Sequence, residues 1–76
     1  MSPKLPAVTA KDLVRVAQKL GFVLRRQRGS HAIYGRDSDK ARVVIPMHSG
    51  TTIKRKTLHG IIQDMKLNPE EFANLL

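Results

Sequence analysis

The side chains best suited to chemistry lie in one ten-residue stretch, Arg25–Tyr34. It holds three arginines, then the turn-forming pair Gly29-Ser30, then His31. Histidine moves protons readily near neutral pH, and arginine offers a fork of donors to phosphate oxygens. Together these groups suit metal-free cleavage of RNA, because the substrate's own 2′-hydroxyl is the nucleophile. The protein then has to supply proton transfer and positive charge.

A second proton-transfer group is also expected. His31 alone cannot easily take a proton from the 2′-hydroxyl and give one to the leaving oxygen at the same moment. The candidates are His48, Tyr34, a lysine and water. Ser30 is not expected to act as a nucleophile, since no carboxylate is placed to orient His31 as in a catalytic triad. The three histidines lack the spacing of metal ligands, so the sequence predicts no metal site and no cofactor.

Positive charge is concentrated in the middle of the chain. The formal net charge is +8, and residues 25–56 hold nine basic and two acidic residues, a net of +7. Such a patch favours a polyanionic partner, most commonly nucleic acid, over a solvated surface without a partner. Within it, Gly29 allows close backbone approach and the Ser30 hydroxyl can bond a phosphate oxygen. The predicted RNA-binding residues are Arg25, Arg26, Arg28, Gly29, Ser30, Lys54, Arg55 and Lys56.

Composition limits the class of protein. The chain has 76 residues, enough for one small domain, which we place at residues 9–76. It has no cysteine, which fits a reducing cytoplasm, and its apolar runs are too short to cross a membrane. Residues 1–8 lack the long apolar segment of a secretory signal and are expected to form an extended lead-in.

A first helix is expected to open at Thr9 in a capping box, with Asp12 as the acidic member. Gly21 should end it, because glycine tolerates the left-handed conformation at a helix C-terminus. Helical spacing predicts a buried face made of Leu13, Val16, Ala17 and Leu20. The exposed face carries a basic stripe, Lys11, Arg15 and Lys19, which is as consistent with plain solvation as with phosphate contact.

Three strands are expected next, at residues 22–28, 31–36 and 42–47. A short Gly29-Ser30 turn and a polar cluster at residues 37–41 join them, and residues 48–52 form a loop. Pro46 should stand at a strand end or at the sheet edge, because proline cannot donate to a ladder. Three strands with short turns make an antiparallel sheet.

Strand alternation leaves two arrangements for the second strand. If His31 faces solvent, Ala32 and Tyr34 face the core. The reverse arrangement buries Ile33 and frees Tyr34 to stack on a base. We favour the first arrangement, because a catalytic histidine must reach its substrate.

Two helices complete the chain. One begins between Ile53 and Thr57 and buries Leu58, Ile61, Ile62 and Met65. The other opens at Asn68-Pro69 and runs to about Leu75, burying Phe72 and Leu75. The predicted fold class is α+β, a two-layer sandwich of helix, three-stranded antiparallel sheet and helix, plus a short C-terminal helix. The helices can cover only one face of the sheet, so the other face or its edge stays open for function.

Several of these segments together resemble the HicA toxin family. The resemblance covers about Lys11 to Leu76. It is carried by Gly21-Phe22, Arg26-Gln27-Arg28-Gly29-Ser30-His31, Val44-Ile45-Pro46-Met47-His48, Thr57-Leu58, Ile61-Ile62 and Leu67-Asn68-Pro69-Glu70-Glu71-Phe72. One departure is Arg55-Lys56, where the family often has Pro-Gly or Gly before Thr-Leu, and it affects only where the second helix starts.

The resemblance implies a double-stranded-RNA-binding-domain-like (dsRBD-like) fold and a ribosome-independent mRNA-cleaving toxin of a toxin–antitoxin pair. It implies that His31 is the essential histidine. It also implies an antitoxin partner, HicB, which covers His31 and the basic surface around it. Direct DNA binding is more often the antitoxin's task in this family.

Two other functions stay open from the residues alone. The chain could be a non-catalytic dsRBD-like module that grips double-stranded RNA through Lys11, Arg15, Lys19 and the basic cluster at residues 54–56. The basic face could also exist chiefly to dock an acidic protein, since complementary charge speeds encounter.

Overall fold

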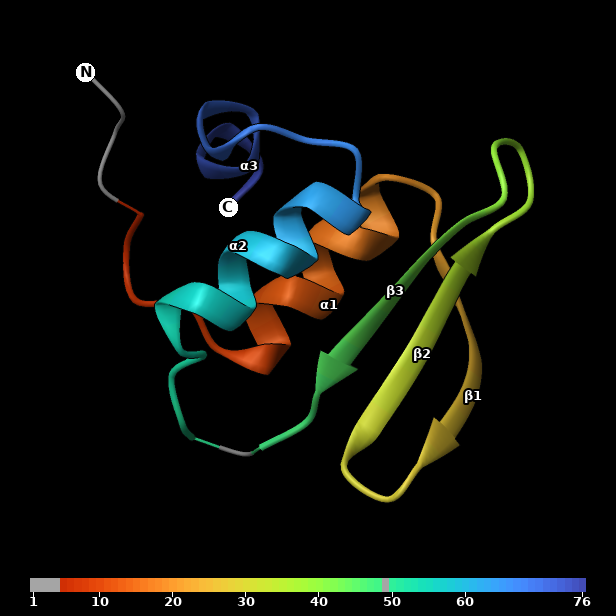
Figure 1. Ribbon diagram of the computed structural model, residues 1–76, viewed down its shortest axis with the longest axis horizontal. Coiled ribbons are helices and arrows are strands. Elements are labelled where there is room, and N and C mark those ends of the chain that lie inside the picture. Colours follow the sequence, from red (N-terminus) through yellow and green to blue (C-terminus); the bar gives the residue numbers. More distant parts are fainter. Residues whose placement is uncertain (1–4, 49) are drawn as a thin grey trace.

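Six elements follow one another in the predicted order of helix, three strands and two helices (Figure 1). The computed structural model describes residues 5–48 and 50–76. Residues 1–4 of the predicted lead-in and Ser49 of the predicted loop therefore lie outside the described residues.

The first helix, α1 (Ala10–Lys19), begins as predicted in a capping box. The Asp12 backbone N–H donates to the Thr9 hydroxyl oxygen, and the Thr9 backbone N–H donates to the Asp12 carboxylate at 3.0 Å. These bonds satisfy helix-start N–H groups that no helical carbonyl can reach. The helix ends before Gly21, which has a φ of +88°. Leu13, Val16 and Ala17 are buried as expected, and Leu20 is half-buried.

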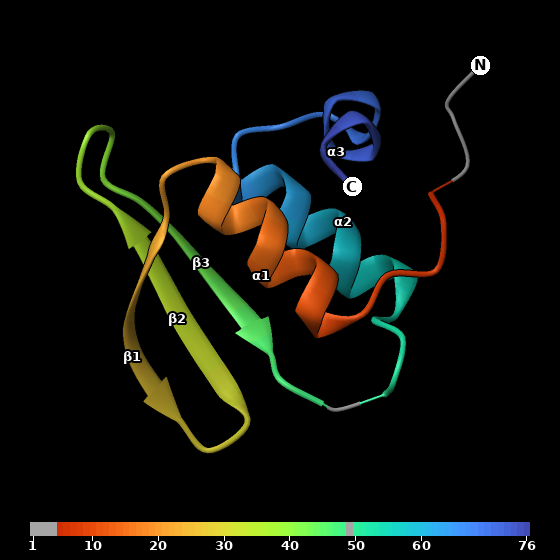
Figure 2. The same cartoon turned by 180° about the vertical axis from the view of Figure 1, so that it is seen from behind.

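The sheet contains β1 (Val23–Arg28), β2 (His31–Arg36) and β3 (Ala41–Pro46). All neighbours are antiparallel and the order is β1-β2-β3. Figures 1 and 2 show α1 and α2 (Arg55–Asp64) side by side along β3, with β1 at the far edge. The predicted α+β class is confirmed, with helices on one face of the sheet. Pro46 ends β3, which is an edge strand, as proline requires.

Two strand boundaries differ slightly from the prediction. Phe22 precedes β1 and is buried, with the Arg36 guanidinium 4.4 Å from the centre of its ring. The third strand begins at Ala41 and ends at Pro46, one residue before the predicted bounds. The first arrangement of β2 is confirmed: Ala32 and Tyr34 are buried and His31 is exposed.

The remaining helices are α2 (Arg55–Asp64) and α3 (Pro69–Leu75). The α2 helix buries Leu58, Ile61, Ile62 and the adjoining Met65, and α3 buries Phe72, all as expected; Leu75 is half-buried. A capping box of Asn68 and Glu71 opens α3, which contacts α1 and α2. None of the described helices is long and apolar enough to cross a membrane.

A core residue in the predicted lead-in was not expected from the sequence. Val8, placed in the lead-in, is 1% exposed and belongs to the hydrophobic core. Its carbonyl oxygen accepts a hydrogen bond from the Ile53 backbone N–H at 2.7 Å, and Thr9 forms an isolated bridge with Thr52. The segment before α1 is thus tied to the segment before α2.

Candidate nucleic-acid interface

The predicted catalytic histidine stands at the tip of the β1–β2 hairpin. His31 is the first residue of β2, is exposed, and pairs in register with Arg28, the last residue of β1. Gly29 in the turn has a φ of +57°, which side-chain-bearing residues rarely adopt. A Cβ built on Gly29 would meet no atom within 4 Å. The backbone beside His31 is therefore open to close approach by a polymer.

The other residue of the turn connects the hairpin to β3. The Ser30 carbonyl oxygen accepts a hydrogen bond from the Met47 backbone N–H. This bond continues the β2–β3 ladder one pair beyond His31 and Pro46, which are register partners. Both sides of His31 are thereby fixed, one by β1 and the other by β3.

The side of the sheet away from the helices is here called the open face. Residues opposite each other in an antiparallel ladder point to the same side, so three rows cross this face. From the hairpin tip, the rows are Arg28, His31 and Pro46; Arg26, Ile33 and Val44; and Val23, Gly35 and Arg42.

A β-bulge adds a further arginine to the open face. The pairing of β1 with β2 shifts between Leu24 and Arg26, so Arg25 is the extra residue. A Cβ built on Gly35 would lie 3.1 Å from Arg25 Nε, which shows that the Arg25 side chain crosses Gly35. Strict alternation would have placed Arg25 opposite to Arg26. Bulges re-aim side chains in this way.

The arginines of the open face differ in their partners. Arg25 Nη2 lies 2.7 Å from Asp37 Oδ1, although the Asp37 side chain is 91% exposed. Within residues 5–48 and 50–76, Arg26, Arg28 and Arg42 form no ion pair. Arg42 was missed as a site residue. Its signal was the alternation of β3, because Val43 and Ile45 are core residues and Arg42 and Val44 must face the other way.

Two other groups of predicted site residues do not lie on the open face. The basic cluster of Lys54, Arg55 and Lys56 is exposed at the start of α2, in the helical layer (Figure 1). His48 lines a depression together with Thr9, Lys11 and Val14, and His31 is not among the residues that line it. The structure therefore brings His31 together with the arginines of β1 but not with residues 54–56.

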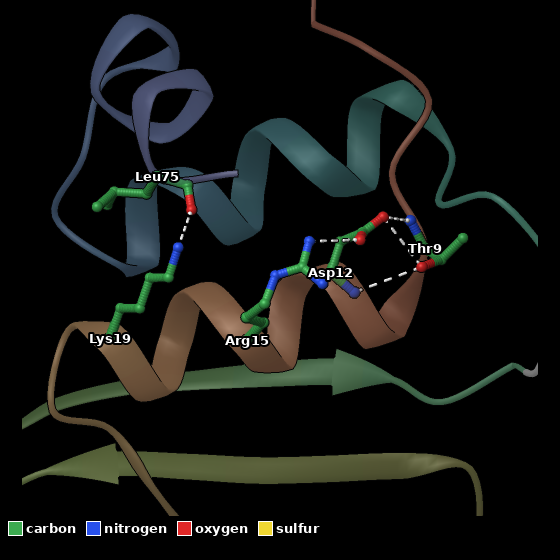
Figure 3. A network of polar contacts seen from close by, with 5 residues as sticks. All are labelled: Thr9, Asp12, Arg15, Lys19 and Leu75. Carbon is green, nitrogen blue, oxygen red and sulfur yellow. Dashed lines mark hydrogen bonds and ion pairs between the residues drawn. The ribbon is translucent and has the colours of Figure 1, made fainter.

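Two of the three cations in the α1 stripe form hydrogen bonds to other residues of the protein (Figure 3). Arg15 Nη2 donates to Asp12 Oδ1 at 3.0 Å, and Lys19 Nζ donates to the Leu75 carbonyl oxygen at 2.9 Å. The hydrogen bond from the Thr9 backbone N–H is the main reason that the pKa of Asp12 is lowered, and Arg15 lowers it further. These contacts fasten α1 to its own cap and to α3.

Arg36 is also a structural arginine. Its Nε and Nη2 donate to the two Asp39 carboxylate oxygens at 2.9 and 2.8 Å, and Nη1 donates to the Leu20 carbonyl oxygen. The hydrogen bonds from Arg36 lower the pKa of Asp39 to about 2 and raise the pKa of Arg36. This arginine therefore links the β2–β3 turn, through Asp39, to the Phe22 ring and to the end of α1.

Comparison with known families gives one clear match. The family model described as the HicA toxin of bacterial toxin–antitoxin matches residues 10–67, which span α1, the whole sheet and α2. A search of curated proteins returns no match. In the part of the chain that the structure describes, no three His, Asp or Glu side chains gather closely enough to hold a metal ion.

Proposed function

The chain belongs to the HicA toxin family of bacterial toxin–antitoxin systems, and we propose that it is a metal-independent, ribosome-independent endoribonuclease that cleaves mRNA with His31. The observation that carries the proposal is the position of His31. It is exposed at the hairpin tip, directly opposite Arg28 and on the face that Arg26 and Arg42 share.

The reaction needs no nucleophile from the protein. The substrate's 2′-oxygen forms a bond to the adjacent phosphorus, and the bond from phosphorus to the 5′-oxygen breaks. A base takes the 2′-hydroxyl proton and an acid gives a proton to the leaving 5′-oxygen, so the products are a 2′,3′-cyclic phosphate and a 5′-hydroxyl. His31 performs one of these transfers, since imidazole both accepts and donates protons.

The second proton-transfer group comes from a reduced set. Tyr34 is 7% exposed and turned toward the helices, which leaves His48, a lysine or water. The position of His48 just past the end of β3, two residues beyond the register partner of His31, keeps it in that set.

Arg28 is the cation best placed to stabilise the reacting phosphate. Directly opposed residues of an antiparallel pair have Cβ atoms about 4.5–5.5 Å apart. The guanidinium of Arg28 can therefore reach a phosphate that His31 serves. Fixed cations aimed at a charge that grows in the transition state lower its energy without reorganisation.

Membership of the family implies a HicB antitoxin partner. We propose that this partner covers His31 and the open face, because blocking the histidine silences cleavage and the unpaired arginines favour an acidic surface. Co-expression with the neighbouring reading frame tests this. The two proteins should co-purify and the complex should leave RNA intact; a complex that still cleaves at the free rate contradicts it.

The alternative of a non-catalytic module that grips duplex RNA through α1 has less support. Its proposed contacts include Arg15 and Lys19, which Asp12 and the Leu75 carbonyl already engage. Duplex recognition of that kind depends on phosphate and 2′-hydroxyl contacts by such side chains.

RNA cleavage by the purified protein in the presence of a chelator tests the proposal. Wild type should cleave, and His31→Ala should cleave at least about 100-fold more slowly, since positioned proton transfer contributes about 10²–10⁴ in rate. His59→Ala is the matched control, because His59 is exposed on α2 and should cleave as wild type. Equal rates for His31→Ala and wild type would refute the role of His31. Cleavage that the chelator abolishes would refute the metal-free chemistry.

A further inference from the structure

The open face extends well beyond the residues that the proposed chemistry uses. Its first row contains His31, and its third row ends at Arg42 on the opposite edge strand. Successive residues of a strand are about 3.3 Å apart, so rows two residues apart are separated by about 6.6 Å. The third row is thus about 13 Å from the first. The spacing of about 6.6 Å between adjacent rows is comparable to the spacing of phosphates along an extended nucleic acid strand.

Cations occur in each of the three rows. Arg28 belongs to the first, Arg26 to the second and Arg42 to the third, where the bulge adds Arg25. No carboxylate belongs to any row; the nearest acid in the sequence, Asp37, follows β2 and pairs with Arg25. An anionic polymer running along β2 would meet a positive charge at each step.

The middle row also offers an apolar surface. Ile33 is half-buried and its neighbour Val44 is 37% exposed, so both present aliphatic groups to solvent. They share a row with Arg26, so a base can rest on them while the phosphates of the strand follow the arginines of the three rows. Bases are available for such contact in single strands and not in a duplex, where they are stacked and paired.

We propose that the open face binds an extended single strand of RNA beside the cleaved bond, with Arg42 and Arg25 as a phosphate subsite two rows from His31 and with Ile33 and Val44 against a base. The assignment rests on the proposed function, since His31 defines where the cleaved bond lies. Arg42 and Val44 on the edge strand β3 then become binding residues in addition to those of the β1–β2 hairpin. The bound segment covers about two nucleotides along β2.

The test measures binding without cleavage, in the His31→Ala protein. A single-stranded eight-nucleotide RNA is titrated at several salt concentrations, and a duplex of equal length serves as competitor. Removing one phosphate contact to a single strand lowers the slope of log affinity against log salt by about 0.7, equivalent to about fivefold in affinity at 0.1 M salt. We expect that change for Arg42→Gln. Arg15→Gln, which changes the same residue type on α1, should leave the slope unaltered.

A second variant separates the base contact from charge. Val44→Thr replaces a methyl group by a hydroxyl and should weaken binding about threefold with no change of slope. Thermal unfolding of each variant checks that the fold is kept, as expected for exposed positions.

The outcomes distinguish the two proposals. The inference about the open face is overturned if Arg42→Gln and Arg15→Gln show the same slope of log affinity against log salt, or if the duplex binds as tightly as the single strand. In either case, cleavage by wild type would still support the proposed function. If wild type leaves RNA intact but Arg42→Gln lowers the slope, the proposed function fails and the open face remains a single-strand binding surface.

Discussion

Two basic surfaces of this protein carry similar charge but have different chemical surroundings. On the outer side of α1, Arg15 is paired with Asp12 and Lys19 donates to the Leu75 carbonyl oxygen. On the open face, Arg26 and Arg28 form no ion pair with any described residue. Two of the three α1 cations are therefore engaged within the domain, whereas on the open face Arg25 pairs with Asp37 and Arg26, Arg28 and Arg42 have no ion-pair partner among the described residues.

The difference arises from the two kinds of backbone. A helix places residues three and four apart beside each other, so the acid that a capping box needs at Asp12 is also within reach of Arg15. A strand offers partners only across the sheet, and the open-face rows contain no carboxylate. The number of basic residues in a sequence therefore does not show which of them have partners inside the protein and which have none among the described residues.

The largest expected effect comes from neutralising each surface in turn. Arg26→Gln with Arg28→Gln should weaken binding of single-stranded RNA about 25-fold at 0.1 M salt, because each of the two phosphate contacts contributes about fivefold. Arg15→Gln with Lys19→Gln should weaken it by less than about twofold. Titration of a labelled RNA in the His31→Ala protein measures both. Equal effects of the two double substitutions would abolish the distinction between the surfaces.

The structural role of the α1 charges is tested by removing their acid. Asp12→Ala deletes the capping-box acceptor and the partner of Arg15, which should cost about 1 kcal/mol of stability. For a domain of this size that lowers the melting temperature by about 4–8 °C.

The control for this variant is Asp64→Ala, which removes the same charge from an exposed position near the end of α2. It should melt within about 2 °C of wild type, as surface changes usually do. RNA affinity should be the same in both variants. A gain in affinity for Asp12→Ala alone would mean that pairing, and not position, keeps Arg15 from RNA.

A smaller effect is expected from Gly35→Ala. The new Cβ would lie 3.1 Å from Arg25 Nε and 3.2 Å from its Cγ, so the flexible arginine must shift by a few tenths of an ångström from its path across Gly35. We expect RNA affinity to fall by about two- to fivefold, at most the contribution of one phosphate. Gly60→Ala, where an added Cβ meets no atom within 4 Å, should leave RNA affinity unchanged. Undiminished binding by Gly35→Ala would remove Arg25 from the interface.

The smallest effect concerns acid. Hydrogen bonds from Arg36 lower the pKa of Asp39 to about 2. A depressed carboxyl pKa means that the stabilisation is fully present above the ordinary value near 3.8 and is lost as the pH falls toward 2. The difference in melting temperature between wild type and Asp39→Asn should therefore be constant from about pH 7 to 5 and shrink as the pH falls from about 4 to 2. A constant difference down to about pH 2 would contradict this assignment.

Much of the fold follows from local sequence signals. The capping boxes at Thr9 and Asn68 fix where α1 and α3 begin, because their side chains have only nearby N–H groups to satisfy. Alternation alone left two arrangements for β2, and the one with His31 exposed was favoured because a catalytic histidine must reach its substrate; the structure confirms it, with Ala32 and Tyr34 buried. Hydrophobic periodicity and turn residues likewise predicted the order of the elements and a sheet with helices on one face only.

The features that were not predicted depend on contacts between distant segments. No local signal in an Arg-Arg pair reveals a bulge, so the joint placement of Arg25 and Arg26 on one face needed the actual register. The bond from Lys19 to the Leu75 carbonyl spans 56 residues of sequence. Val8 lies in the core where its carbonyl oxygen accepts a hydrogen bond from the backbone N–H of the distant Ile53.

The position of β1 has a consequence for the solubility of the free protein. β1 is an edge strand exposed along its whole length, so its outer N–H and C=O groups are a template on which a second copy could add a strand. Its arginines and its bulge are the features that oppose such edge-to-edge pairing, through like-charge repulsion and irregular geometry. The same charges that we propose to attract an anionic strand therefore also oppose self-association. Neutralising them should therefore weaken binding and also raise the risk of aggregation, which sedimentation of the variants would reveal.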